Sequence, residues 1–303
     1  MLNRRFLLIT KTNITLLVIK AVMKKILSLF IILFIHQTMH AQAPPRLIIR
    51  GDDMGFAHAG NLGIIESYKN GIERSVEVLV PSPWFPEAVR LLNDNPRIDV
   101  GIHLTLTSEW DNLKWRPLTD CKSLQDSNGY FYPMIWENKN YLDKNLLAHA
   151  WKLPDIEKEW RAQIELALKE VPRISHISAH MGCTNMNDTV YALARKLAKE
   201  YHIDIEPKDF NVINISYDGA HTTSAEKIKS FIKMLDALKP GNTYLFVDHP
   251  AINSPEMLAI HHIGYENVAQ DRQGVVDVFT SDEVKKVIQQ KQIQLISYKD
   301  LLQ

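Results

Sequence analysis

The strongest constraint on the fold is a regular alternation between short apolar runs and longer amphipathic ones. Runs such as "RLIIRG", "SVEVLV" and "IDVGIHL" are separated by segments whose apolar residues recur at helical spacing. Helices are expected over residues 59–71, 84–94, 155–170, 187–201 and 281–291, with a last strand over 293–298. Strands that alternate with helices indicate βαβ units, so we expect a single α/β domain with a parallel sheet.

Four of the expected strands end in Asp or His. These residues are Asp52 and Asp53, His103, His180, and Asp248 with His249. In a parallel α/β fold the C-terminal strand ends gather on one face, where active sites are built. One Asp and two His form a mixed oxygen and nitrogen set that binds a divalent ion. The pattern therefore predicts a metal site at this face.

The spacing of His176 and His180 decides which of them is the better ligand. On an extended strand these two residues share a face but lie roughly 13 Å apart, too far to bind one ion. We expect His180, at the strand end, to be the ligand and His176 to be a deeper, hydrogen-bonded barrel residue. A structural role is expected for the other histidines, His58, His149, His202, His221, His261 and His262.

The adjacent carboxylates Asp52 and Asp53 repel each other unless a positive charge lies nearby. Asp53 is predicted to bind the ion, whose charge offsets this repulsion. Asp52 is predicted to act as general base on a metal-activated water, and His249 as general acid toward the leaving group. Asp-Asp-x-Gly is also ordinary turn chemistry, so the prediction depends on the other strand ends.

Residues 105–152 interrupt the alternation and are predicted to form a long aromatic-rich loop. Such loops frequently carry function. Among its aromatic residues, Trp110, Trp115 and Tyr132 are the predicted substrate-binding residues, stacking on sugar rings. A small satellite core beneath the loop is the structural alternative.

The N-terminal region predicts a secretory signal peptide over residues 1–41. Lys24 and Lys25 precede an apolar run, and "MHA" before Gln42 resembles a cleavage site. Met23 is the expected start, because residues 1–22 stand upstream of this signal. We expect the mature domain, residues 42–303, to cross the inner membrane into the periplasm and to keep no stable membrane span.

Charge and cysteine content narrow the function further. Residues 1–41 hold six Lys or Arg and no Asp or Glu, so the mature chain has 29 basic and 35 acidic residues, a net charge of −6. Nucleic-acid binding is disfavoured because it needs a clustered basic surface. The two cysteines, Cys121 and Cys183, could form one bridge in an oxidising compartment or remain free thiols.

The chain resembles the YdjC-like carbohydrate deacetylases, which include chitooligosaccharide deacetylase and a hopanoid-linked deacetylase. The resemblance covers nearly the whole mature chain and rests on "GDDMGFAHAGNLGIIESYKNGI", "VGIHLTLT", "SHISAH", "FVDHPA" and "SDEVKKVIQQKQIQLISYKDL". It implies a distorted (β/α) barrel and one divalent ion, magnesium or zinc. It also implies Asp53, His103 and His180 as metal ligands, Asp52 as catalytic base, and His249 at a His-Pro position near the site.

One segment departs from the family pattern. Ser178 stands where the family commonly has Asp, so a carboxylate that would orient His180 is expected to be missing. The leading hypothesis is a secreted hydrolase that removes an acetyl group from an N-acetylated sugar by attack of metal-activated water. The alternatives are a metal-dependent hydrolase of another carbohydrate ester or phosphoester, and a non-catalytic carbohydrate-binding protein. A homodimer is one option for its assembly.

Overall fold

The computed structural model describes residues 20, 22–26 and 43–303, and the chain separates into two units, Met1–Ala43 and Pro44–Gln303. The predicted signal peptide lies almost entirely outside the described residues and stays a prediction. Among the described residues, no helix combines the length and apolar character needed to cross a membrane. The second unit contains the sheet and every residue proposed for the site.

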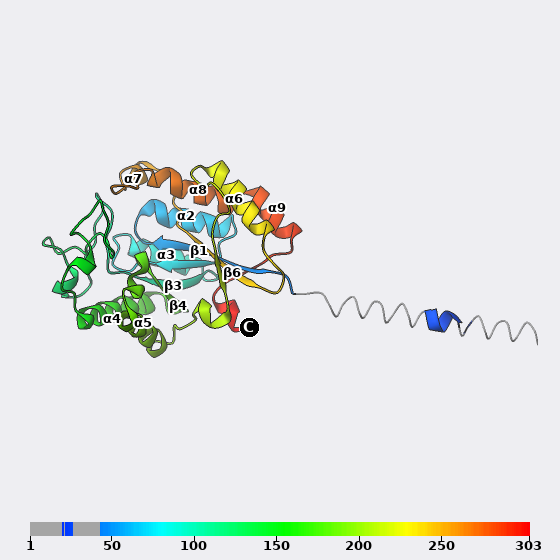
Figure 1. The fold of residues 1–303 in the computed structure, drawn as a ribbon, viewed down its shortest axis with the longest axis horizontal. Helices are drawn as coiled ribbons and strands as arrows, with labels where there is room; N and C mark the ends of the chain where they lie inside the picture. Colours follow the sequence, from blue (N-terminus) through cyan, green and yellow to red (C-terminus); the bar gives the residue numbers. More distant parts are fainter. Residues whose placement is uncertain (1–19, 21, 27–42) are drawn as a thin grey trace, which may run out of the picture. The chain divides into compact units, whose positions relative to one another are not determined.

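Seven parallel strands form the sheet of the second unit, and its helices cover both faces (Figure 1). The strands are β1 (Arg46–Met54), β2 (Ser75–Val78), β3 (Asp99–Leu104), β4 (His176–Ala179), β5 (Ile213–Ile215), β6 (Thr243–Asp248) and β7 (Gln294–Ile296). Their order is β4-β3-β2-β1-β6-β5, and β7 pairs with the first residues of β1. The sheet curls into a half-barrel, which confirms the predicted α/β fold with a distorted barrel.

The helices divide between the two sides of the half-barrel. In Figure 1, α2, α6, α8 and α9 lie on one side of the sheet, and α4 and α5 lie on the other. Their bounds are α2 His58–Lys69, α3 Phe85–Asp94, α4 Leu153–Glu170, α5 Asp188–Glu200, α6 Ser224–Asp236, α7 Pro255–Leu258, α8 Val268–Thr280 and α9 Asp282–Gln290. Short 3-10 turns span Lys122–Leu124, Leu146–Ala148, His180–Asn185, Pro207–Phe210 and Lys299–Leu302.

Side-chain caps mark several helix starts. The Asn187 side chain accepts a hydrogen bond from the Val190 amide at the start of α5. Ser281 caps α9, and Thr223 with Glu226 forms a capping box on α6. Helices α6, α7 and α8 and the three-residue strand β5 are present in the structure but were not predicted from the sequence.

Apolar packing buries the central strand on both faces. Leu47, Ile48 and Ile49 on β1 are fully buried, as expected for a strand between two layers of helices. The loop over residues 105–152 contains only two short 3-10 turns and isolated bridges, as predicted, and its Phe131 packs into the main core. Cys121 and Cys183 are both buried and free, so they do not pair.

Candidate metal centre

A bulge at the end of β1 turns both adjacent carboxylates toward one point. Between Gly51 and Met54, β1 contains one more residue than the paired stretch of β2. Within this bulge Asp53 has φ +70°, a left-handed conformation that is uncommon outside glycine. Neighbouring residues of a regular strand point to opposite faces. Because of the bulge, Asp52 and Asp53 instead both lie near the His103 ring.

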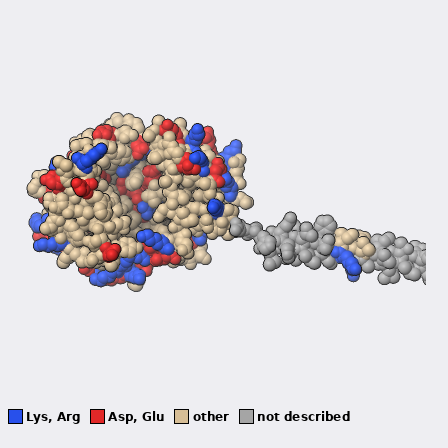
Figure 2. All heavy atoms as spheres, in the orientation of Figure 1, with Lys and Arg blue, Asp and Glu red and all other residues tan. Residues whose placement is uncertain are grey.

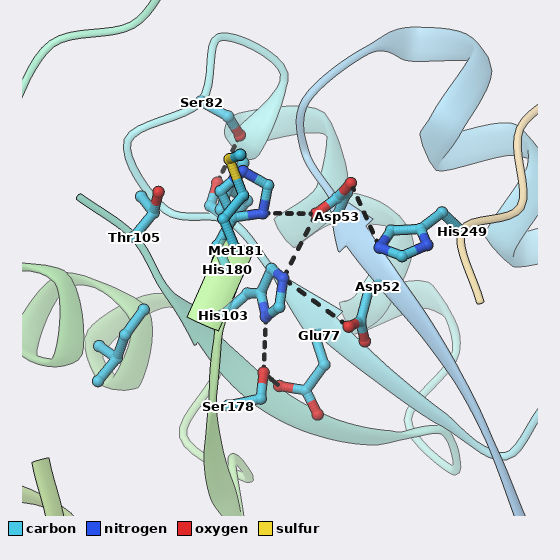
Figure 3. A network of polar contacts seen from close by, with 12 residues as sticks. Asp52, Asp53, Glu77, Ser82, His103, Thr105, Ser178, His180, Met181 and His249 are labelled. Carbon is cyan, nitrogen blue, oxygen red and sulfur yellow. Dashed lines mark hydrogen bonds and ion pairs between the residues drawn. The ribbon is translucent and has the colours of Figure 1, made fainter. Parts of the chain in front are cut away.

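The structure brings Asp53, His103 and His180 together, as Figure 3 shows. One potential ligand atom from each residue lies within 4.8 Å of the other two, and all three residues are buried. Asp53 Oδ1 is 3.4 Å from His103 Nε2 and 3.1 Å from His180 Nδ1. The three residues come from the ends of β1, β3 and β4, so the arrangement depends on the parallel sheet.

His180 follows directly after β4, where the chain enters a 3-10 turn. The next two residues, Met181 and Gly182, have positive φ, so the backbone turns sharply away from the strand. The His180 ring lies between two carboxylates: its Nδ1 faces Asp53, and its Nε2 is 3.0 Å from Glu109 Oε2. Burial opposes protonation of the ring, but Glu109 and Asp53 together raise the pKa of His180 to about 10.

The expectation that no carboxylate orients His180 is therefore wrong. Glu109, from the long loop after β3, takes this place and is buried. Ser178 contacts the other histidine instead: its hydroxyl lies 2.7 Å from His103 Nδ1 and donates to Glu77 Oε2 at 2.6 Å. A carboxylate more than 70 residues away from His180 in the chain cannot be identified from the local segment alone.

The hydrogen bonds determine which ring nitrogens are free to bind an ion. An ionised carboxylate only accepts, so the Nε2–H of His180 donates to Glu109, and the neutral ring that an ion would bind has its lone pair on Nδ1. The Ser178 hydroxyl donates its hydrogen bond to Glu77, so His103 Nδ1 donates to the Ser178 oxygen, and the neutral ring has its lone pair on Nε2. Both lone pairs lie beside Asp53 Oδ1.

The two oxygens of Asp53 have different surroundings. Oδ2 accepts a hydrogen bond from Arg272 at 2.9 Å, whereas Oδ1 is buried and has no hydrogen-bond partner among the described residues. Nearby His180, His249 and Arg272 outweigh burial and hold the pKa of Asp53 well below its usual value. A buried carboxylate oxygen beside two imidazole lone pairs fits a divalent ion, because such a set satisfies its normal coordination.

Asp52 is fixed by Arg50, whose guanidinium donates to both carboxylate oxygens at 2.7 and 2.9 Å. Arg50 also donates to the Tyr298 hydroxyl at 2.7 Å. The Oδ2 atom of Asp52 is 3.8 Å from His103 Nε2, so this carboxylate stands beside the candidate metal position. The fork contact restricts its orientation more strongly than a single hydrogen bond would.

His249 lies on the opposite side of Asp53 from His180 (Figure 3). Its Nε2 is 3.9 Å from Asp53 Oδ2, and its Nδ1 is 3.6 Å from Asp248 Oδ1. Burial opposes protonation, but Asp53 and Asp248 raise the pKa of His249 above its ordinary value. Asp248 is in turn held by the Tyr217 hydroxyl at 2.8 Å.

A cavity of about 460 Å³ opens above these residues. Beyond the residues already described, Trp110, Met181, His262, Tyr265 and Asp271 help to line it. Trp110 is almost fully buried and packs beside the Arg272 guanidinium at 5.1 Å. Trp115 and Tyr132 do not line this cavity, and Tyr132 stacks on His149 at 4.2 Å. Substrate binding by the three aromatics stays a prediction.

Two further histidines differ in their position: His262 lines the cavity and His176 does not. His176 is fully buried, lies 2.6 Å from Glu77 Oε1 and stacks on Tyr298, as predicted for a deeper barrel residue. His262 lines the cavity, although the sequence suggested only a structural role.

On the face shown in Figure 2, Lys and Arg side chains are interspersed with Asp and Glu.

Arg272 and Glu109 were not identified from the sequence. Arg272 lies on α8, a helix that the sequence did not predict, and reaches Asp53 across 219 positions of chain. Glu109 follows soon after His103 in "HLTLTSEW", and an acidic residue beside a predicted ligand is the one signal that could have marked it.

Together these features define a class: a parallel α/β half-barrel with a buried Asp-His-His centre at the C-terminal ends of its strands. The family model described as YdjC-like protein matches residues 46–290, and the chain belongs to this family. This confirms the resemblance found in the sequence.

Known relatives match the chain over most of its length. Carbohydrate deacetylase from Clostridium beijerinckii is 30% identical over 268 residues, and carbohydrate deacetylase 1 from Listeria innocua is 28% identical over 265 residues. Each match covers 84% of this chain and 100% of the relative. A crystal structure from Enterococcus faecalis V583, of a protein named for cellobiose-phosphate cleavage, aligns with TM-score 0.66 at 24% identity. That alignment covers 86% of this chain and 99% of the other, and it shows a shared fold.

Proposed function

We propose that this protein is a metal-dependent deacetylase of an N-acetylated sugar or oligosaccharide. The observation that carries the proposal is the convergence of Asp53, His103 and His180, with Asp53 Oδ1 buried and without a hydrogen-bond partner in the part of the chain that the structure describes. Relatives named carbohydrate deacetylases support the reaction and the substrate class. Two imidazole nitrogens and one carboxylate oxygen suit zinc, and magnesium is the alternative.

The residues around the candidate metal position divide the work of the reaction. A divalent ion held by Asp53, His103 and His180 would supply Lewis acidity toward the acetyl carbonyl and would activate water. Asp52, oriented by Arg50, accepts the proton of the attacking water. His249, on the other side of Asp53, gives a proton to the leaving amine. Arg272 fixes Asp53 through Oδ2 and leaves Oδ1 to the ion.

An acetate-release assay tests the proposal. The protein is stripped with a chelator and supplied with Zn²⁺ or Mg²⁺, then incubated with N-acetylated mono- and oligosaccharides. Acetate release that disappears with the chelator and returns with one metal is expected. Matched O-acetyl sugars and phosphoesters form the other arms, and hydrolysis of these alone would contradict the proposed amide specificity. Acetate release that continues at full rate without metal would contradict metal dependence.

Export of the protein is a further part of the proposal, supported by the apolar run and cleavage pattern before Gln42. N-terminal sequencing of the mature protein after expression in a bacterial host is the test. A mature chain in the periplasmic fraction that begins near Gln42 is expected. A chain that keeps its N-terminal residues in the cytoplasmic fraction would contradict export.

A further inference from the structure

Strand register places five residues of β2, β3 and β4 on the same inner face of the half-barrel. Glu77 pairs with Gly101, and Gly101 pairs with His176, so these three form one row across the sheet. His103 and Ser178 are paired in the next row of the same face. The inner face therefore carries a charged and polar cluster directly below the candidate metal position.

Gly101 is what allows the outer two residues of the first row to meet. A Cβ atom at this position would collide with Glu77 Oε2 and would lie 2.5 Å from His176 Nε2. Without that atom, Glu77 and His176 reach across β3 and approach to 2.6 Å. The strand between them thus contributes space rather than a side chain.

A continuous set of hydrogen bonds connects this pair to the candidate ligand His103. His103 Nδ1 lies 2.7 Å from Ser178 Oγ, and Ser178 donates to Glu77 Oε2 at 2.6 Å. A serine hydroxyl has only one proton to donate. Because Ser178 donates this proton in a hydrogen bond to Glu77, its oxygen accepts a hydrogen bond from His103. The neutral His103 ring therefore carries its proton on Nδ1 and not on Nε2.

Other contacts hold Glu77 in place. His176 binds its Oε1, stacks on the Tyr298 ring at a centroid distance of 3.6 Å, and is bonded on Nδ1 to Ser175 at 2.7 Å. Ser175 donates to Asp99 at 2.8 Å. Glu77 and His176 are fully buried, and neither lines the 460 Å³ cavity, so neither is placed to contact substrate.

We propose that Glu77 is a positioning residue of the metal centre, acting through Ser178 on His103. Without Glu77, the Ser178 hydroxyl could donate to His103 Nδ1. The ring would then carry its proton on Nε2, the nitrogen that faces Asp53 and the candidate metal position. The buried carboxylate of Glu77 removes that choice, and its charge strengthens the basicity of His103 Nε2. The proposal rests on the proposed metal site. Glu77 and Ser178 together would fix the tautomer of His103, as Glu109 alone does for His180.

Zn²⁺ affinity tests the proposal without reference to activity. The full chain is stripped with a chelator, and the dissociation constant for Zn²⁺ is measured by competition with a chromophoric chelator. Glu77→Gln and Ser178→Ala are each expected to weaken binding by about 10–100-fold. Adding Ser178→Asp to Glu77→Gln is expected to restore most of the affinity, because a carboxylate then meets His103 Nδ1 directly.

Glu159→Gln is the matched control. Glu159 is also a fully buried glutamate, but it accepts hydrogen bonds from the Leu118 and Thr119 amides at 3.0 Å, in the long loop. Its replacement is expected to reduce stability without a change in Zn²⁺ affinity. A general effect of altering a buried carboxylate would weaken Zn²⁺ binding in both variants and would overturn the proposal.

Wild-type Zn²⁺ affinity in folded Glu77→Gln would also overturn it. If Glu77→Gln does not fold, Ser178→Ala decides the question, because it removes the link and leaves the Glu77–His176 pair intact. Unchanged affinity in Ser178→Ala then overturns the proposal while the metal site stands. A wild-type chain that binds neither Zn²⁺ nor Mg²⁺ would instead overturn the proposed metal site and this inference with it.

Discussion

The Nε2 atom of His180 lies 3.0 Å from Oε2 of Glu109, and the opposite ring nitrogen faces Asp53 Oδ1 at 3.1 Å. This contact decides how His180 can act. Glu109 accepts a hydrogen bond from the Nε2–H of His180, so the lone pair of the neutral ring is on Nδ1 and faces the candidate metal position. The residue that completes the His180 site therefore comes from the long loop and not from the strand that carries His180.

Replacing Glu109 with alanine is expected to weaken Zn²⁺ binding by about 10–100-fold, because His180 loses the partner that fixes its tautomer and orientation. Isothermal titration of chelator-stripped protein measures the change. Glu200→Ala, which removes an exposed carboxylate paired with Arg161 on α4, is the control and should bind Zn²⁺ as the wild type does. Equal affinity in the two variants would exclude a role for Glu109.

Replacing Asp52 is expected to have a different effect from replacing Asp53, although the two residues are adjacent. Asp52→Asn should bind Zn²⁺ nearly normally but lower kcat for acetate release by about 10²–10⁴-fold, as expected on loss of a general base. Asp53→Asn should lose the bound ion. Elemental analysis together with acetate-release kinetics distinguishes the two. Loss of metal in both variants would contradict the separate roles.

Gly101→Ala is expected to destabilise the fold by about 1–3 kcal/mol, because the added methyl group overlaps the Glu77–His176 pair. Urea denaturation measures the free energy of unfolding. Gly274→Ala on α8 is the comparison, since the nearest atoms there are flexible Lys227 side-chain carbons at 3.1 and 3.3 Å. If Gly101→Ala lowers the free energy of unfolding no more than Gly274→Ala does, the Glu77–His176 pair can move to accommodate the added methyl group.

Stability should fall at acid pH through Glu77. Burial raises its pKa, but His176 and Arg50 outweigh this and lower it from 4.5 to about 2. A carboxyl group with a depressed folded-state pKa stabilises the fold fully above its unfolded pKa, and this contribution is lost as pH falls toward the folded value.

The wild type should therefore lose its stability advantage over Glu77→Gln as pH falls from about 5 to about 2. Chemical denaturation of both proteins across this range gives the difference in unfolding free energy. A difference that does not change with pH would show that the Glu77 carboxylate has the same pKa in the folded and unfolded chains.

Much of the site was predicted because strand ends are local features of the sequence. Asp53, His103 and His180 each follow an apolar run, and parallel strands bring such ends to one face. The strand expected to end at His180 was predicted less accurately: β4 spans only His176–Ala179, and His180 begins a 3-10 turn. The backbone of Met181 and Gly182 determines that boundary, and hydrophobic periodicity does not report on positive φ.

The sequence by itself determined the α/β class, the strands that end in Asp or His, and membership of the YdjC-like family, because periodicity and short motifs are local. Only the tertiary structure decided how adjacent Asp52 and Asp53 reach the same point, since that requires the bulge in β1 and a left-handed Asp53. It also selected Glu109, Arg272 and Glu77 as partners of the site. Their contacts join segments distant in the chain, and the parallel register and loop path bring them within hydrogen-bonding distance.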